Sequence, residues 1–385
     1  WLDSASWSLL LRVRRELPEI LIALSTRPLP DIPDPITRSE YQRLRQSPDA
    51  KVLSLLPLSR EETALHLAES LGTGKLPAPL LEFVFAQTAG HPFFGEELVF
   101  ALVDAGVVRV QDAVCQLTVT PDELRDKRLP TTLNGVVQSR IDRLRPPQNL
   151  LLKIASVVGR TFSHYIVDGV HPIHTDRPHL RNYLDDLEQY ALTAKLSDEE
   201  LTYCFRHNLI QDVAYGTLSF AQRRQLHLAV VAFYEHRARD LAVIHRREDA
   251  YPLLAHHASQ AAEHPHASPE ELHDAVVYLQ RAAEQAMKSG GAREALGLLD
   301  RALALLPRLA HSRTRDKLEL SLRVPQTIAL GVVRGYAANE TEQALQRCLV
   351  QCQHAAESVK GTPVPELFPT LFGLWCCNVL RGRLW

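Results

Sequence analysis

Residues able to bind a phosphate group follow an apolar run near the start of the chain. Ile20 to Leu24 is a short continuous apolar run, which is typical of a strand buried on both faces of a parallel sheet. Ser25, Thr26 and Arg27 follow it, at the carboxyl end of the strand, where α/β sheets bind ligands. A guanidinium offers phosphate oxygens a rigid fork of donors. The alternative is that Arg27 is a solvent-exposed residue at a strand end.

A proline stands in a forced break between two helices. Gly90, His91 and Pro92 separate helices that we expect over 77–88 and 93–105. A proline ring is rigid and apolar, so ordering it against a flat ligand costs little entropy. The alternative is a kink with no binding role. Glu96 and Glu97 follow on the second helix, and we expect them to be solvated.

A histidine occupies a third junction. Thr202 to Phe205 alternates like a strand, and the pattern turns helical from Asn208 to Leu218. His207 lies between them. An imidazole can donate to a phosphate oxygen, and a nearby helix N-terminus favours an anion. The alternative is that His207 only caps the helix.

The elements that must position these residues are mainly helical. Val52 to Leu56 is a second apolar strand candidate, and Ser59 with Glu62 forms a capping box that opens a helix. From residue 130 three helices precede a strand pair, which is the order of a winged helix. From residue 222 the pattern is helical almost throughout.

One segment of this last region has the spacing of a tetratricopeptide (TPR) unit. Small residues let two antiparallel helices approach closely, Gly290 and Gly291 supply the turn, and Pro307 ends the second helix. The consensus aromatic residue is missing, so the repeat is degenerate. The spaced residues are Leu279, Ala283, Ala295, Leu299, Ala302 and Pro307.

The composition excludes several classes of protein. The net charge is −2, so no global basic field indicates nucleic acid. No apolar run approaches eighteen residues, so we expect no membrane span. Six cysteines in 385 residues make no disulfide framework, which favours the cytoplasm. The chain begins at Trp1 instead of Met, and we expect it to be incomplete at its N-terminus.

Two other candidate sites are rejected on their spacing. Leu71 to Lys75 lacks the first glycine and the final Ser/Thr of a phosphate-binding P-loop, and it joins two helices. Two histidine groups lack accompanying cysteines and lie in Pro-rich surroundings, so we expect surface loops instead of zinc sites. They comprise residues 171, 174 and 179, and residues 256, 257, 264 and 266.

Several segments, taken in order, resemble one family. The resemblance is to STAND ATPases, nucleotide-dependent signalling switches, and above all to the ATPase-plus-TPR region of class III adenylate or guanylate cyclases, including the soluble adenylyl cyclase group. It covers most of the chain. The segments are Trp1 to Asp3 with Trp7, Ile22 to Pro28, Thr88 to Leu98 (the "GxP" segment), Leu129 to Leu133, Ser139 to Leu144, Ala155 to Phe162, Phe205 to Tyr215 (the "MHD" segment), Gly335 to Glu340 and Glu366 to Gly382.

The resemblance implies a domain order. Residues 1–58 would be the C-terminal remnant of an α/β P-loop NTPase core, and residues 59–128 a helical lid. A winged helix at 129–225 and a TPR-like α-solenoid at 226–385 would follow. The fold class is therefore mainly α.

The resemblance also implies roles for four residues. Arg27 would face the γ-phosphate of ATP with Thr26 beside it, Pro92 would pack on adenine, and His207 would touch the β-phosphate of ADP. We predict no catalytic residue and no metal ligand, because the P-loop is absent and Mg²⁺ would need acids preceding Trp1. The chain alone is not expected to hydrolyse ATP.

The expected function is a regulatory ATP/ADP switch whose repeats bind a protein partner, with a cyclase as output. A kinase or DNA-binding output, or a non-catalytic TPR scaffold, are the alternatives. Arg140, Arg143 and Arg145 lie on the expected winged helix, but neighbouring acids such as Asp185 and Asp186 argue against DNA contact.

Overall fold

The computed structural model describes residues 4–26, 35–126, 130–240, 250–358 and 364–383. These residues are mainly helical and divide into two compact units. One unit is Leu53–Phe233, and the other combines Trp1–Val52 with Tyr234–Trp385. Among the described residues, no helix is long and apolar enough to cross a membrane.

The first half of the Leu53–Phe233 unit is a helical cluster with a small hairpin. Ser59 caps its first helix, and the Glu62 carboxylate accepts from the Ser59 N–H, so the predicted capping box is confirmed. Buried side chains such as Leu67, Leu80, Val84 and Leu102 form one core. The elements are α3 (Arg60–Ser70), α4 (Ala78–Thr88), α5 (Pro92–Asp104), β1 (Val108–Gln111), β2 (Val114–Leu117) and α6 (Pro121–Asp126).

The second half of this unit has the predicted order of three helices and a strand pair, with an additional short strand and helix. Its antiparallel sheet has the order β3-β5-β4. Helix α7 connects the two halves, because its Val136 belongs to the core of the first half. The elements are α7 (Leu133–Ile141), α8 (Pro146–Val158), β3 (Thr161–Ser163), α9 (His164–Val170), a 3₁₀ turn (Arg177–His179), α10 (Leu180–Gln189), β4 (Thr193–Ser197), β5 (Thr202–Phe205) and α11 (Asn208–Gly216).

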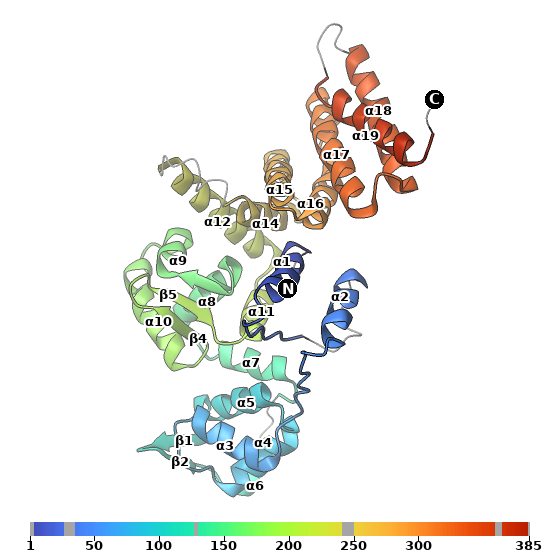
Figure 1. Cartoon of the computed structure of the whole chain (residues 1–385). Coiled ribbons are helices and arrows are strands. Elements are labelled where there is room, and N and C mark those ends of the chain that lie inside the picture. The colour runs from blue at the N-terminus through green and yellow to red at the C-terminus, as the bar shows by residue number, and fades with distance from the viewer. Residues whose placement is uncertain (1–3, 27–34, 127–129, 241–249, 359–363, 384–385) are drawn as a thin grey trace. The chain divides into compact units, whose positions relative to one another are not determined.

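The described residues of the other unit form helices joined by turns and loops, with no strand among them. From α14 onward each helix packs against the next one in the chain (Figure 1). Helix α12 (Phe220–Asp240) spans the boundary between the units. The remaining elements are α1 (Ser4–Glu16), α2 (Pro35–Arg45), α14 (Tyr251–Ala262), α15 (Pro269–Lys288), α16 (Ala292–Leu305), a 3₁₀ turn (Leu306–Arg308), α17 (Arg313–Arg334), α18 (Asn339–Ser358) and α19 (Leu367–Leu380).

The residues with repeat spacing form the contact between α15 and α16. Gly290 has φ +83° in the turn between the helices, and Pro307 lies in the 3₁₀ turn that ends α16. The pattern therefore identified a real helical hairpin. The five residues buried in one core are Leu279, Ala283, Ala295, Leu299 and Ala302.

Two expected strands are absent, and both predictions were wrong for the described residues. Residues 20–24 and 52–56 have no strand, and their side chains are largely exposed, with Leu21 at 93% and Leu55 at 95%. A buried parallel strand needs a hydrogen-bonding neighbour. Both sheets among the described residues are antiparallel, and neither includes these runs.

Candidate functional site: two histidine-capped helix starts

His91 caps the start of α5. Its Nδ1 accepts from the Phe94 N–H at 3.2 Å, and Pro92 follows at the first helical position, where no N–H is needed. Gly90 has φ +76°, and a Cβ there would lie 2.1 Å from the Leu58 carbonyl oxygen. The break therefore requires glycine for two reasons, its backbone conformation and this close approach. It leaves the Pro92 ring exposed.

His207 caps the start of α11 in the same way. Its Nδ1 accepts from the Leu209 N–H at 3.1 Å. Hydrogen bonds at the end of strand β5 position His207. The Phe205 N–H donates to the Arg160 carbonyl at 3.0 Å, and the Arg206 N–H donates to the Leu192 carbonyl at 3.2 Å. His207 therefore does cap the helix, and the cap uses only its Nδ1 atom. Whether the ring also binds a phosphate group stays a prediction.

The two helix starts lie together. The Phe93 ring stacks on the His207 imidazole, with centroids 3.6 Å apart and planes 18° apart. Partial burial lowers the pKa of His207, and the positive charges of Arg160 and His91 lower it further. Glu96 and Asp212 act in the opposite direction. The surroundings of His207 therefore disfavour an added positive charge.

The capping geometry assigns the role of each Nδ1 atom in the two rings. Because each Nδ1 accepts a backbone N–H, we place the ring proton on Nε2 in His91 and His207. Each ring then carries one N–H donor in addition to the helix N–H groups. Helix starts also carry a partial positive charge. Two such starts beside Arg160 form an arrangement that suits an anion.

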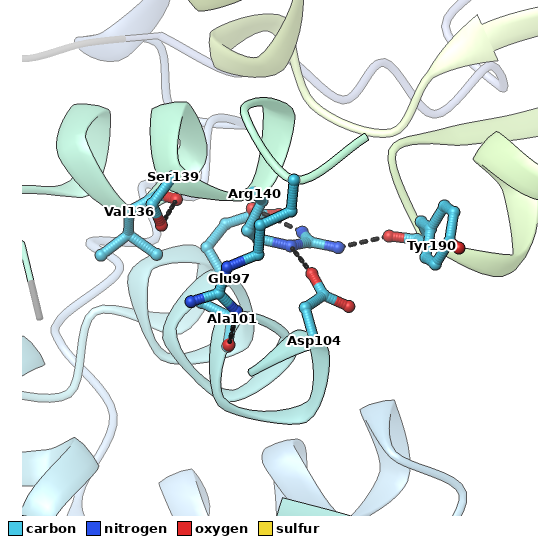
Figure 2. Close-up of polar contacts among 8 residues, drawn as sticks. Glu97, Ala101, Asp104, Val136, Ser139, Arg140 and Tyr190 are labelled. Carbon is cyan, nitrogen blue, oxygen red and sulfur yellow. Dashed lines mark hydrogen bonds and ion pairs between the residues drawn. The ribbon is translucent and has the colours of Figure 1, made fainter. Parts of the chain in front are cut away.

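A buried ion network lies behind this site. Arg140 of α7 pairs with Glu97 of α5 at 2.7 Å between Nη1 and Oε2, and both side chains are 1% exposed. Its Nε lies 2.9 Å from a carboxylate oxygen of Asp104, and its other terminal nitrogen donates to the Tyr190 carbonyl (Figure 2). Burial raises the pKa of Glu97, and Arg140 opposes that shift. The guanidinium thus binds two carboxylates of α5 and one backbone carbonyl at the end of α10.

This network corrects two sequence predictions. Glu97 is not a solvated helix residue, because it needs the Arg140 charge in a buried setting. Glu96 is also largely covered, and accepts from the Ser70 hydroxyl at 2.7 Å. Arg140 cannot contact DNA, because its guanidinium is enclosed. Arg145 remains mostly exposed and pairs with Asp186.

The structure unites two of the four predicted binding residues. Pro92 and His207 belong to the two joined helix starts. Thr26 is exposed, lies in the other unit and follows no strand. Arg27 lies outside the described residues, so its prediction stays untested.

Sequence reasoning missed three contributors: the capping role of His91, the Phe93 ring and Arg160. The capping role could have been inferred, because an acceptor side chain immediately before a helix-starting proline is a typical N-cap. The Phe93 stack depends on a contact between residues more than a hundred positions apart, and nothing local indicates it.

Two histidines predicted in surface loops are buried. His171 and His257 are each 1% exposed, the first at the end of α9 and the second inside α14. Their elements are apolar helices, so the Pro-rich flanks misled the prediction. Across the described ranges, no group of three or more His, Cys, Asp or Glu side chains could hold a metal ion.

Comparison with known proteins gives one partial match. A family model described as a domain of unknown function, DUF8739, matches residues 59–116. These residues run from the Ser59 cap through α3, α4, α5 and β1 into β2, so they include the His91 helix start. No match was found among the curated proteins or among the solved structures.

Proposed function

We propose that the Leu53–Phe233 unit binds the phosphate group of a nucleotide, ATP or ADP, at the joined starts of α5 and α11. The observation that carries this proposal is the Phe93–His207 stack, which brings two capped helix starts to one place. The two imidazoles supply Nε2–H donors there, because each Nδ1 accepts a backbone N–H. An anion bound at this point would also relieve the unfavourable charge environment of His207.

The exposed Pro92 ring supports a nucleotide over a simple anion. It is a rigid apolar surface at the first turn of α5, beside the stacked pair. A base packed on it would cover apolar surface at little entropic cost. We place adenine here, in accordance with the resemblance to STAND ATPases.

The two unpaired apolar runs support an α/β core in the complete site. Covering side chains as exposed as Leu21 and Leu55 stabilises a fold by about 25 cal/mol for each Å² buried. In this proposal the cover is a further protein surface, which the resemblance to STAND ATPases implies is an α/β core. In this proposal, which rests on the resemblance to STAND ATPases, residues 1–58 belong to an NTPase core that has Thr26 and Arg27 among its nucleotide-binding residues. We propose binding without hydrolysis for this chain, because its sequence contains no P-loop motif.

The switch proposal extends to the remaining regions. Residues 59–128 act as lid, residues 129–225 as a winged helix, and residues 226–385 as TPR-like repeats that receive a protein partner. The output is a class III nucleotide cyclase, and a kinase or DNA-binding output is the alternative. A non-catalytic scaffold is the second candidate, supported by the succession of packed helices from α14 to α19.

An NMR titration of the 385-residue chain with ADP and with inorganic phosphate tests the proposal. We expect the His207 ring signals to move and its pKa to rise when either ligand binds. Replacing His207 with Ala should remove the change, and His164→Ala in the same unit is the control. If neither ligand moves the His207 signals, the nucleotide proposal fails and the scaffold candidate is favoured.

A further inference from the structure

We propose that Arg140 is a positioning residue for the two histidine-capped helix starts, holding α5 against the β5–α11 junction. Its effect on ligand binding rests on the proposed function, whereas its effect on geometry does not. The charge network contacts neither histidine, and it acts through the elements that carry them.

On one side Arg140 fixes α5. Glu97 lies one and a half turns beyond the Pro92 start, and Asp104 is the last residue of the helix. The Arg140 guanidinium binds both, so it holds α5 at two points along its length. Arg143, just after the end of α7, donates a further hydrogen bond to the Ala101 carbonyl of α5 at 3.1 Å. The direction of α5, and therefore the place of His91, depends on α7.

On the other side Arg140 fixes the strand that carries His207. It donates to the Tyr190 carbonyl at the end of α10. Two residues further on, the Leu192 carbonyl accepts from the Arg206 N–H, and His207 comes next. The Arg140 and Arg206 guanidinium carbons also lie 5.1 and 5.4 Å from the centroid of one ring, Phe100 of α5. A single buried side chain thus joins both histidine-bearing elements.

Only an arginine side chain can bind Glu97, Asp104 and the Tyr190 carbonyl at the same time. Its planar fork presents five N–H donors, and here three partners lie in different directions. A lysine could keep the charge beside Glu97, but its ammonium is a single point and cannot also reach Asp104 and Tyr190. The Arg140→Lys variant therefore separates charge from geometry.

The test compares full-length Arg140→Lys with a charge-free pair, Glu97→Gln with Arg140→Met. Removing the charges of Glu97 and Arg140 together avoids leaving the fully buried Glu97 carboxylate unpaired, which would be strongly destabilising. Asp104 also loses its partner, but its side chain keeps 18% exposure to solvent. Arg60→Met is the matched control, because Arg60 pairs with Glu82 on the exposed surface of the same half. Circular dichroism and thermal melting establish that each variant folds.

The geometric readout is the ring-current shift that Phe93 imposes on the His207 ring protons. We expect it to be lost in both Arg140 variants and kept in Arg60→Met. The ligand readout is affinity for ADP, which should fall about tenfold, as for one lost charge-assisted hydrogen bond. Folded Arg140 variants that keep the full ring-current shift overturn the inference.

The two readouts distinguish this inference from the proposed function. If the wild-type chain binds no ADP but the ring-current shift is lost in the variants, the proposed function fails and the positioning role stands. If ADP binds equally well to wild type and to folded variants, the positioning role fails. If the charge-free pair does not fold, Arg140→Lys still decides the question.

Discussion

At the scale of single residues, Gly90 imposes the sharpest steric requirement. Ala at this position would combine φ +76° with a Cβ contact of 2.1 Å on the Leu58 carbonyl. We expect Gly90→Ala to lower the free energy of unfolding by about 2 kcal/mol or more. Urea unfolding monitored by circular dichroism measures this change. Gly74→Ala is the control, since nothing lies within 4 Å of its added Cβ, and an equal loss there would contradict the prediction.

His207 gives a prediction for pH. Its pKa is lowered in the folded chain, so the unfolded chain binds more protons between the folded pKa and the unfolded value of about 6.5. Its contribution to stability is therefore complete above about pH 6.5 and is lost as the pH falls through the folded pKa. Protonation of Nδ1 also removes the cap on Leu209.

Asn caps helices well but does not titrate, so His207→Asn should reduce this acid sensitivity. Unfolding free energies from pH 5 to 8 test the comparison. Burial also lowers the pKa of His171, so the variant should keep part of the slope. Identical slopes in wild type and variant would exclude a contribution from His207.

Cysteine reactivity gives a third residue-scale prediction. Burial raises the pKa of Cys348 to about 11, so at pH 7.5 only about three thiols in ten thousand are thiolates. We expect Cys348 to resist a maleimide in the folded chain, whereas the less buried Cys204 and Cys376 are labelled first. Mass spectrometry of the labelled peptides reports the order. Early labelling of Cys348 would show that α18 opens readily.

At the scale of elements, local pattern predicted helices well and strands unevenly. The helices at 78–88 and 92–104 followed from apolar period, caps and breaks, all of which act within a few residues. Strand β5 was also predicted correctly. Residues 20–24 and 52–56 satisfied the same apolar criterion but have no strand neighbour among the described residues. A strand is specified by its partners, and a single sequence does not name them.

The candidate site shows the same difference between local features, which the sequence predicts, and long-range contacts, which it does not. The place of His207 between a strand and a helix was predictable, because it is a local junction. The Phe93 stack and the Arg140–Glu97 pair were not, since they join residues 114 and 43 positions apart. Glu97 in particular looked like a solvated helix acid, because periodicity alone gave no indication of its buried cation.

At the scale of the whole molecule, the division into two compact units implies two responses to mutation. Leu102 is fully buried in the first unit and Leu299 in the second. Replacing either with Ala should cost about 2–5 kcal/mol in its own core. Hydrogen exchange should then show Leu102→Ala loosening α5 while α15 and α16 keep their protection, and Leu299→Ala should do the reverse. Loss of protection in both units from either change would show a single cooperative structure.

The chain-order packing from α14 to α19 has a mechanical consequence. When each helix packs chiefly on its neighbours, small rotations at successive interfaces add up, so we expect this part of the molecule to be compliant along its length. A pulling load would be divided among the successive interfaces instead of concentrating at one.

The buried Arg140 network differs from this arrangement, because one side chain holds several elements at a single place. We therefore expect the helices from α14 to α19 to deform easily under load and the residues around the Arg140 network to deform little.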